Sequence, residues 1–290
     1  KKITKVLGPA RDIDIQIEFL TKYIESISLS DKKNKPGLSR MLWRLKHKRN
    51  KSQIKLNKTL NDFKKSNFIN DFQKKLNLTV LKNQIKKIEN SGDAKVSKKI
   101  FEQSSSLTGK QQMLNSLKEV ILKSAVIKNI NLSENDLSAN NTNTEFYSAD
   151  KILDSSFIFE NADALHILRK SIKTLRYQME IFNFYFDNIF DKNIKTIKDM
   201  QTILGDIHDC DVWIGLLPVF LKKEKKRTLK YFGNTRNFYK LQNGAVNLFN
   251  DRIIKRNLLY SELLKLWNDF ELTGFFDKLK NKIIKFKHKN

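Results

Sequence analysis

Cationic and aromatic side chains recur at one-turn spacing along residues 163–182, between apolar residues that repeat with the same period. At roughly 100° per residue, these two sets occupy separate faces of one helix. The polar face consists of His166, Arg169, Lys170, Lys173, Arg176 and Tyr177. Cations one turn apart repel one another unless an anion neutralises them, and the first acid on this face is Glu180. The pattern therefore predicts a surface that binds a polyanion through ammonium and guanidinium donors.

A second basic stripe lies on a helix expected over residues 38–65. No acid interrupts its arc of roughly 100° over about five turns, or roughly 27 Å. The arc holds Arg40, Arg44, His47, Lys48, Lys51, Lys55 and Lys58. This length suits an extended polyanion better than a single phosphate. A weaker set, Arg252, Lys255 and Arg256, lies on the last long helix, where a solvated face is an equal alternative.

Both helices also carry an apolar stripe that predicts a buried face. On the segment 163–182 this stripe is Leu165, Leu168, Ile172, Leu175, Met179 and Phe182. On the segment 38–65 it is Leu42, Leu45, Leu56, Leu60 and Phe63. Burial of these stripes is expected to point the basic stripes outward.

The chain as a whole is basic, and it has enough apolar residues to fold. It has 290 residues, with 56 Lys and Arg against 31 Asp and Glu, which gives a net charge of +25. An anionic partner is expected, and nucleic acid, an acidic membrane and polyphosphate all qualify. Hydrophobic residues make up 40% of the chain and include 20 Phe, which excludes a disordered polyelectrolyte.

Few residues in this sequence favour tight turns. Only 9 Gly and 3 Pro are present, and folds built on sheets need more of both, so we expect an all-α fold. No apolar stretch approaches the roughly 18–20 residues of a membrane-spanning helix. Cys210 has no partner for an internal disulfide, and we interpret it as small buried filler in a protein of the reducing cytoplasm.

An internal repeat of the pattern Leu-Gly-x-x-basic-Asp-x-Asp-aliphatic predicts two related helical bundles. The first copy spans residues 7–15, and the second spans residues 204–212, an offset of 197 residues. In the first copy, Gly8 and Pro9 predict the end of one helix and Arg11 the start of the next, and the second copy is expected to form the same junction. Four aspartates of the two copies are interpreted as helix-start and ion-pairing residues: Asp12, Asp14, Asp209 and Asp211.

Further helices are expected on both sides of a polar linker at residues 133–144. A polar loop is expected over residues 28–37. The remaining expected helices cover residues 67–89, 111–130, 163–186, 193–204, 210–225 and 245–270. The Lys-rich runs at residues 222–226 and 278–289 are interpreted as solvated charge.

The two motifs together resemble the CHAD family, the conserved histidine α-helical domain. The residues that carry this resemblance are His166-x-x-Arg169-Lys170-x-x-Lys173-x-x-Arg176-Tyr177, followed by Leu204-Gly205-x-x-His208-Asp209-x-Asp211-Val212. Residues 7–15 look like the junction of that family's first repeat. The family's basic helix before this junction has no counterpart here. Either residues are absent upstream of Lys1, or the channel that the family forms is incomplete.

The resemblance implies two helical bundles, residues 1–132 and 163–290, joined by a linker and lead-in segment at residues 133–162. They are expected to face one another across a central basic channel that binds inorganic polyphosphate. The implied binding set is His166, Arg169, Lys170, Lys173, Arg176 and Tyr177, with a less specific match at Arg40, Arg44 and Lys48. The spacing of the basic stripes alone, without a family match, adds four residues to this set: Lys51, Lys55, Arg252 and Arg256. Residues expected to orient these side chains are Arg11, Asp12, Asp14, His208, Asp209 and Asp211.

We therefore expect non-catalytic polyphosphate binding, with no cofactor, metal or membrane partner, in the cytoplasm and at polyphosphate granules. A nucleic-acid binder is the first alternative, because aromatic residues near basic ones can stack bases; these are Trp43, Tyr231, Phe238 and Tyr239. A metal-dependent phosphohydrolase of the HD type is the second, from His208, Asp209 and His166. Against it, Arg11 replaces His208 in the first copy, and a cation is no metal ligand. Storage, granule targeting and regulation of a partner enzyme all stay open as biological roles.

Overall fold

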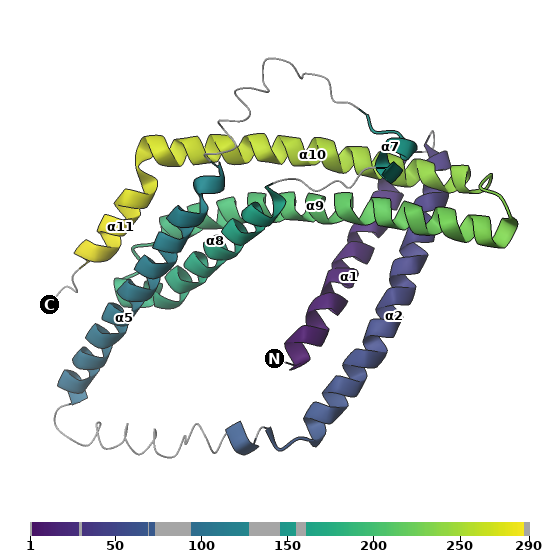
Figure 1. Ribbon diagram of the computed structural model, residues 1–290. Helices are drawn as coiled ribbons and strands as arrows, with labels where there is room; N and C mark the ends of the chain where they lie inside the picture. Colours follow the sequence, from purple (N-terminus) through teal and green to yellow (C-terminus); the bar gives the residue numbers. More distant parts are fainter. Residues whose placement is uncertain are drawn as a thin grey trace. The chain divides into compact units, whose positions relative to one another are not determined.

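The computed structural model describes residues 2–28, 31–68, 70–72, 94–127, 146–154 and 161–286. Every regular element within these ranges is a helix, so the expected all-α fold is confirmed for the described part of the chain. In chain order the elements are α1 (Lys2–Ser26), η1 (Lys32–Asn34), α2 (Lys35–Lys65), α5 (Ala94–Lys123), α7 (Ala149–Asp154), α8 (Ala162–Phe182), η2 (Asn183–Phe186), α9 (Asp191–Phe232), α10 (Phe238–Thr273) and α11 (Phe275–Lys285) (Figure 1).

The expected helix-turn-helix junctions at the two repeat copies are wrong. Helix α1 runs through Gly8 and Pro9, and α9 runs through Gly205. Glycine before proline removes the Cβ that would clash with the ring in a helical conformation, so α1 can continue. In α9, buried residues recur without a break across the glycine, at Leu204, Ile207, Cys210 and Ile214. Packing along this face keeps the helix intact.

This continuity changes the interpretation of the repeated aspartates. Asp12 and Asp14 lie inside α1, and Asp209 and Asp211 lie inside α9, so none of them begins a helix. The separate helices expected over residues 193–204 and 210–225 are one helix for the same reason. Helices α9 and α10 instead end at Gly233 and Gly274, whose positive φ angles of 67° and 60° are those of left-handed helix ends.

Other helix boundaries also differ from the expected ones. Helix α2 begins at Lys35, inside the expected loop, because Pro36 suits the first helical turn. Helix α8 ends at Phe182 and is followed by a short 3₁₀ segment, where one helix to residue 186 was expected. Helices α5 and α10 begin earlier than expected, at Ala94 and Phe238. The linker at residues 133–144 and most of the helix at residues 67–89 lie outside the described residues.

The chain forms two compact units, each made of separate segments. The first comprises Lys1–Gly92, Ser148–Asp154 and Leu217–Leu248, and the second comprises Asp93–Tyr147, Ser155–Leu216 and Phe249–Asn290. Helices α9 and α10 therefore contribute residues to both units. These units are defined by packing and divide the chain differently from the sequential bounds 1–132, 133–162 and 163–290, which stay a prediction.

In the first unit, helix α1 packs against α2 (Figure 1). Close packing also joins the start of α2 to the start of α10, where two backbones nearly touch. A Cβ added to Gly37 would overlap the backbone oxygen of Leu241, and one added to Gly244 would overlap the backbone oxygen of Asn34. Glycine at these two positions lets the helices approach, and this approach fixes α2 in place.

In the second unit, helix α8 is held by its apolar face. Leu165, Leu168, Ile172, Leu175 and Met179 are buried as expected, whereas Phe182 is half-buried. Helix α5 packs against α8, and α11 packs against α5. At the α5 contact, a Cβ on Gly109 would stand 2.8 Å from the Phe182 ring. These contacts determine which face of α8 reaches solvent.

The two types of helical glycine give a stability prediction. A Cβ on Gly205 meets only the Arg169 guanidinium, at 3.7 Å and beyond, which is an ordinary contact distance. Gly205→Ala should therefore raise the free energy of unfolding by about 0.5–1 kcal/mol, because alanine favours a helix interior. Gly37→Ala should instead lower it by about 1–3 kcal/mol or more through overpacking. Urea unfolding followed by circular dichroism measures both. Destabilisation by Gly205→Ala would indicate that the chain turns at Gly205, as the sequence pattern predicts.

Candidate anion-binding surfaces

The polar face of helix α8 is presented by burial of its opposite face. Lys170 and Lys173 are exposed, and Arg169 and Arg176 are half-buried. Arg169 lies across α9, where its Nε is 3.7 Å from the position of a Cβ on Gly205. The neighbouring helix thus limits the freedom of this guanidinium. Its Nε atom is buried and has no hydrogen-bond partner among the described residues.

Tyr177 organises the far end of this face. Its ring is 42% exposed, with the Lys173 ammonium 5.5 Å and the Arg176 guanidinium 4.6 Å from the ring centroid. Arg176 Nη1 also donates to Glu180 Oε1 at 3.2 Å. Cation–π contacts stabilise two cations beside one another. The carboxylate offsets one positive charge, so the face stays strongly positive.

Two histidines meet where α8 contacts α9. The rings of His166 and His208 have centroids 4.5 Å apart, with an interplanar angle of 31°. Burial lowers the pKa of His166, as do the neighbouring His208, Lys170 and Arg169, while Asp163 opposes them. His166 is therefore neutral at pH 7 without a ligand. An approaching anion would favour its protonated form.

In the first unit, helix α2 places its basic stripe along an exposed face. Lys48, Lys51 and Lys55 are exposed. Arg40 and Arg44 sit at the start of the stripe and bond to Glu224 of α9, with Nε to carboxylate distances of 3.4 Å and 3.0 Å. The stripe thus begins with two arginines bonded to Glu224 and continues as a row of exposed lysines.

The predicted residues of helix α10 have different environments. Arg256 is only 7% exposed, and its Nε donates to Asp211 Oδ1 at 2.5 Å. Arg252 is half-buried near Cys210. Burial raises the pKa of the Cys210 thiol, with Arg252 opposing and nearby aspartates adding to the shift. A protonated, buried thiol fits the interpretation of Cys210 as filler.

The second aspartate of each repeat copy makes the same kind of bond. Asp14 of α1 accepts from Arg49 Nε of α2 at 2.6 Å, and Asp211 of α9 accepts from Arg256 Nε of α10 at 2.5 Å. Each bond joins a motif helix to the next long helix of its unit. Their environments differ, because the Asp14 carboxyl side chain is 52% exposed and that of Asp211 is 13% exposed. The remaining orienting candidates, Arg11, Asp12 and Asp209, are exposed. His208, the last of these orienting candidates, is half-buried, and its ring lies against that of His166.

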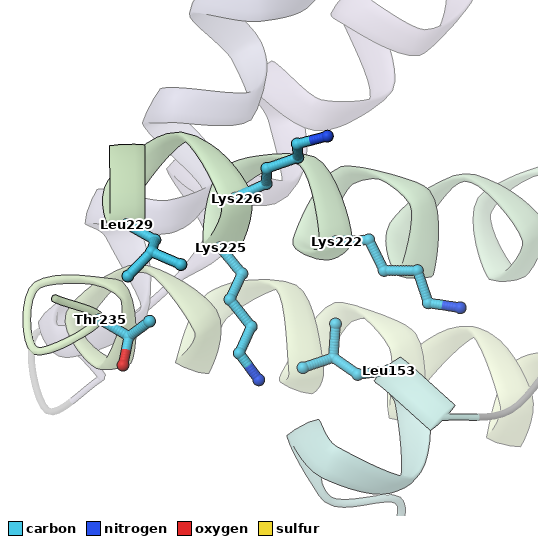
Figure 2. A pocket seen from close by; sticks show the side chains of 6 residues that line it. All are labelled: Leu153, Lys222, Lys225, Lys226, Leu229 and Thr235. Atoms are coloured by element: carbon cyan, nitrogen blue, oxygen red, sulfur yellow. The ribbon is translucent and has the colours of Figure 1, made fainter. Parts of the chain in front are cut away.

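The Lys-rich run of α9 lines a pocket of about 350 Å³ in the first unit. Its walls are Leu153, Lys222, Lys225, Lys226, Leu229 and Thr235. Figure 2 shows Leu153 on α7. Lys222 and Lys225 extend on one side of α9, and Lys226 points away from that side. The lysines are exposed, as expected for solvated charge.

Metal-ligand clusters and membrane-spanning helices are both absent from the described residues. Nowhere in these ranges do three or more His, Cys, Asp or Glu side chains gather as metal ligands would. None of the described helices has an apolar stretch long enough to cross a lipid bilayer.

Comparison with known proteins identifies the family. The family model of the CHAD domain matches residues 1–218, three quarters of the sequence. The chain belongs to the CHAD family. Comparisons with curated proteins and with solved structures gave no match. The CHAD match includes the basic faces of α2 and α8 and both copies of the repeated motif.

One residue that sequence reasoning missed lies beyond the CHAD match. Glu224 is 1% exposed, and it bonds Arg227 as well as the two α2 arginines. A signal for it was present in the sequence, because Glu224 is the single acid of a basic run and shares a face with Leu217, Leu221 and Thr228. That face is buried. Arg49, the partner of Asp14, was also missed.

The two equivalent aspartates should differ in their effect on stability. Asp211→Ala removes a carboxylate that pairs with the buried Arg256 guanidinium and should cost about 3–5 kcal/mol of unfolding free energy. Asp14→Ala breaks a more exposed pair and should cost about 0–1 kcal/mol. Chemical unfolding of both variants at pH 7 tests this difference. Equal losses of unfolding free energy in the two variants would show that burial does not strengthen the ion pair between Asp211 and Arg256.

Proposed function

We propose that this CHAD protein binds inorganic polyphosphate without hydrolysing it. The observation that supports the proposal is the arrangement of α8, whose apolar face is buried while its basic face lies toward solvent. Polyphosphate offers repeated phosphoryl oxygens and no base to stack or edge to read. Its receptor therefore needs a ladder of cations, which a helix supplies at each turn.

The proposed roles follow the local environments. Lys170 and Lys173 contact phosphates as mobile point charges, and Arg169 and Arg176 donate from restrained guanidinium groups. His166 donates once protonated. Along α2, Lys48, Lys51 and Lys55 extend the contact as a second row. On α10, the buried Arg256 is held by Asp211 and is given no phosphate contact, whereas the half-buried Arg252 stays a predicted contact. The channel between the bundles stays a prediction from the family resemblance.

The proposal excludes turnover because of the charges around the two histidines. Burial lowers the pKa of His166, and repulsion from Lys170 and Arg169 lowers it further. The same repulsion disfavours a divalent cation at this position. In the first copy of the motif, Arg11 replaces His208. We therefore retain a binding role, in the cytoplasm and at polyphosphate granules, with storage, targeting and regulation of a partner enzyme as its alternatives.

Nucleic-acid binding is the second candidate, and exposed aromatic residues favour it. Trp43 is 53% exposed, Tyr231 76% and Tyr239 59%, whereas Phe238 is buried at 2% and cannot stack a base. The Trp43 ring already contacts the Arg44 guanidinium, 4.7 Å from its centroid, and stacks on His47 at 5.9 Å. These contacts reduce the ring surface offered to a base. We therefore rank this function below polyphosphate binding.

A competition experiment with charge-reversed protein tests the proposed function. Long-chain polyphosphate should displace single-stranded DNA and tRNA at equal salt, and its affinity should fall steeply with salt. The double variant Lys173→Glu, Arg176→Glu changes the local charge by −4 and should weaken polyphosphate binding by about 100-fold or more.

Leu175→Ala is the control on the other face of α8. It should lower stability by about 2–5 kcal/mol, while the folded protein keeps its affinity. Phosphate release with Mg²⁺ or Mn²⁺ is measured in the same samples and should not exceed background. Tighter binding of DNA than of polyphosphate, unchanged binding by the double variant, or metal-dependent turnover lost in His208→Ala would each reject the proposal.

The lowered pKa of His166 predicts a pH dependence of binding. Without ligand, the folded protein favours the neutral form of His166. The stability that this neutral histidine contributes is present above pH 6.5 and is lost as pH falls through the lowered pKa of His166. A bound polyanion stabilises the protonated form, so affinity should rise as pH falls below about 6.5. His166→Gln should show a smaller rise between pH 7.5 and 5.5. Because His208 remains in both proteins, equal pH profiles would remove His166 from the site.

A further inference from the structure

Glu224 occupies an unusual position for a carboxylate in this basic protein. Its side chain is 2% exposed, and it accepts hydrogen bonds from Arg40 and Arg44 of α2 and from Arg227 of α9. Its backbone oxygen accepts a further bond from Thr228 Oγ1 at 2.9 Å. The carboxylate therefore joins two helices of the first unit at a point where three guanidinium groups converge.

The charge of Glu224 is maintained by these arginines. Burial alone would raise the pKa of the carboxyl, but hydrogen bonds from Arg44 and Arg227 outweigh burial and lower it. Glu224 is therefore ionised at neutral pH. Three guanidinium groups around one carboxylate leave a net charge of +2. The cluster is strongly cationic, although an acid lies at its centre.

The arginines are anchored on their inner side and open on their outer side. Their side chains are 46%, 27% and 40% exposed for Arg40, Arg44 and Arg227. Trp43 also restrains two of these arginines, because the guanidinium carbons of Arg40 and Arg44 lie 5.5 Å and 4.7 Å from its ring centroid. Each guanidinium has five N–H donors, so bonds to Glu224 leave donors free to reach an anion. Restrained donors lose less entropy when a phosphate binds.

We propose that Glu224 is a positioning residue, which holds Arg40, Arg44 and Arg227 as a preformed guanidinium cluster for phosphate groups of a polyphosphate chain. This inference rests on the proposed function. It adds that Glu224, although negatively charged, promotes the binding of a polyanion. Arg227 becomes a phosphate-contacting residue as well. Both residues lie outside the matched part of the chain, residues 1–218.

Removing the charge of Glu224 separates positioning from simple electrostatics. Glu224→Gln makes the protein more positive, so electrostatics alone predicts tighter polyphosphate binding. Positioning predicts the opposite, because an amide oxygen cannot hold three mutually repelling guanidinium groups. We expect affinity to fall by about tenfold, in line with the loss of charge-assisted hydrogen bonds. Titration of polyphosphate at fixed salt measures the change.

The matched control is Glu18→Gln, which removes the same charge from an exposed carboxylate of the first unit that pairs with Lys22. Its affinity should be unchanged or slightly higher. A second readout is the dependence of affinity on salt concentration. Loss of phosphate contacts in Glu224→Gln should make this dependence shallower, by analogy with nucleic acids, whereas a smaller folded fraction would leave it unchanged.

Arg227→Lys decides the question if Glu224→Gln does not fold. Lysine keeps the charge of this half-exposed position but loses the forked geometry, so affinity should fall by about tenfold at constant net charge. Binding as tight as the parent in folded Glu224→Gln would overturn the positioning role, and parental binding in Arg227→Lys would overturn it if Glu224→Gln does not fold. If the parent itself does not bind polyphosphate, the proposed function fails. If the parent binds and these variants bind equally well, only this inference fails.

Discussion

Repulsion between like charges is the constraint on which this structure depends. The chain has a net charge of +25, and its cations are concentrated one helical turn apart on α2 and α8. Such rows destabilise a helix by themselves. On α8, an apolar face from Leu165 to Met179 is buried against its own unit and offsets this cost. Burial of one face thus keeps the charged face assembled before any ligand arrives.

Acids are outnumbered by cations in this protein, 31 to 56, and the burial of a carboxylate determines what it can do. Asp211 is largely buried and restrains Arg256, and the buried Glu224 holds three arginines that repel one another. Asp14 makes a similar bond at a more exposed position, where solvent screens it. A buried carboxylate among guanidinium groups remains ionised, as the lowered pKa of Glu224 indicates. A few well-placed negative charges can therefore organise a large positive surface.

Helix continuity gives the basic surfaces their rigidity. Helix α9 runs unbroken past Gly205, so Arg169 and His166 of α8 both lie along one continuous helix. At the start of α2, Gly37 and Gly244 allow close backbone approach and fix the helix that carries Arg40 and Arg44. Rigid helices keep cation spacing constant, which favours repeated contacts with a ligand that is itself periodic.

The sequence alone determined the helical class, the split between basic and apolar faces on α8, and the CHAD family, because these depend on residue type and on a 3.6-residue period. It did not distinguish Gly8 and Gly205, which lie inside helices, from Gly233 and Gly274, which end them. Local residue preferences are similar at all four positions, and packing along the whole helix selects between the outcomes. Glu224 shows the same limit. Its run of lysines indicated solvated charge, but only the packing of α9 against α2 brings Arg40 and Arg44 to it from 180 residues away or more, because ion pairs between distant segments have no period in the sequence.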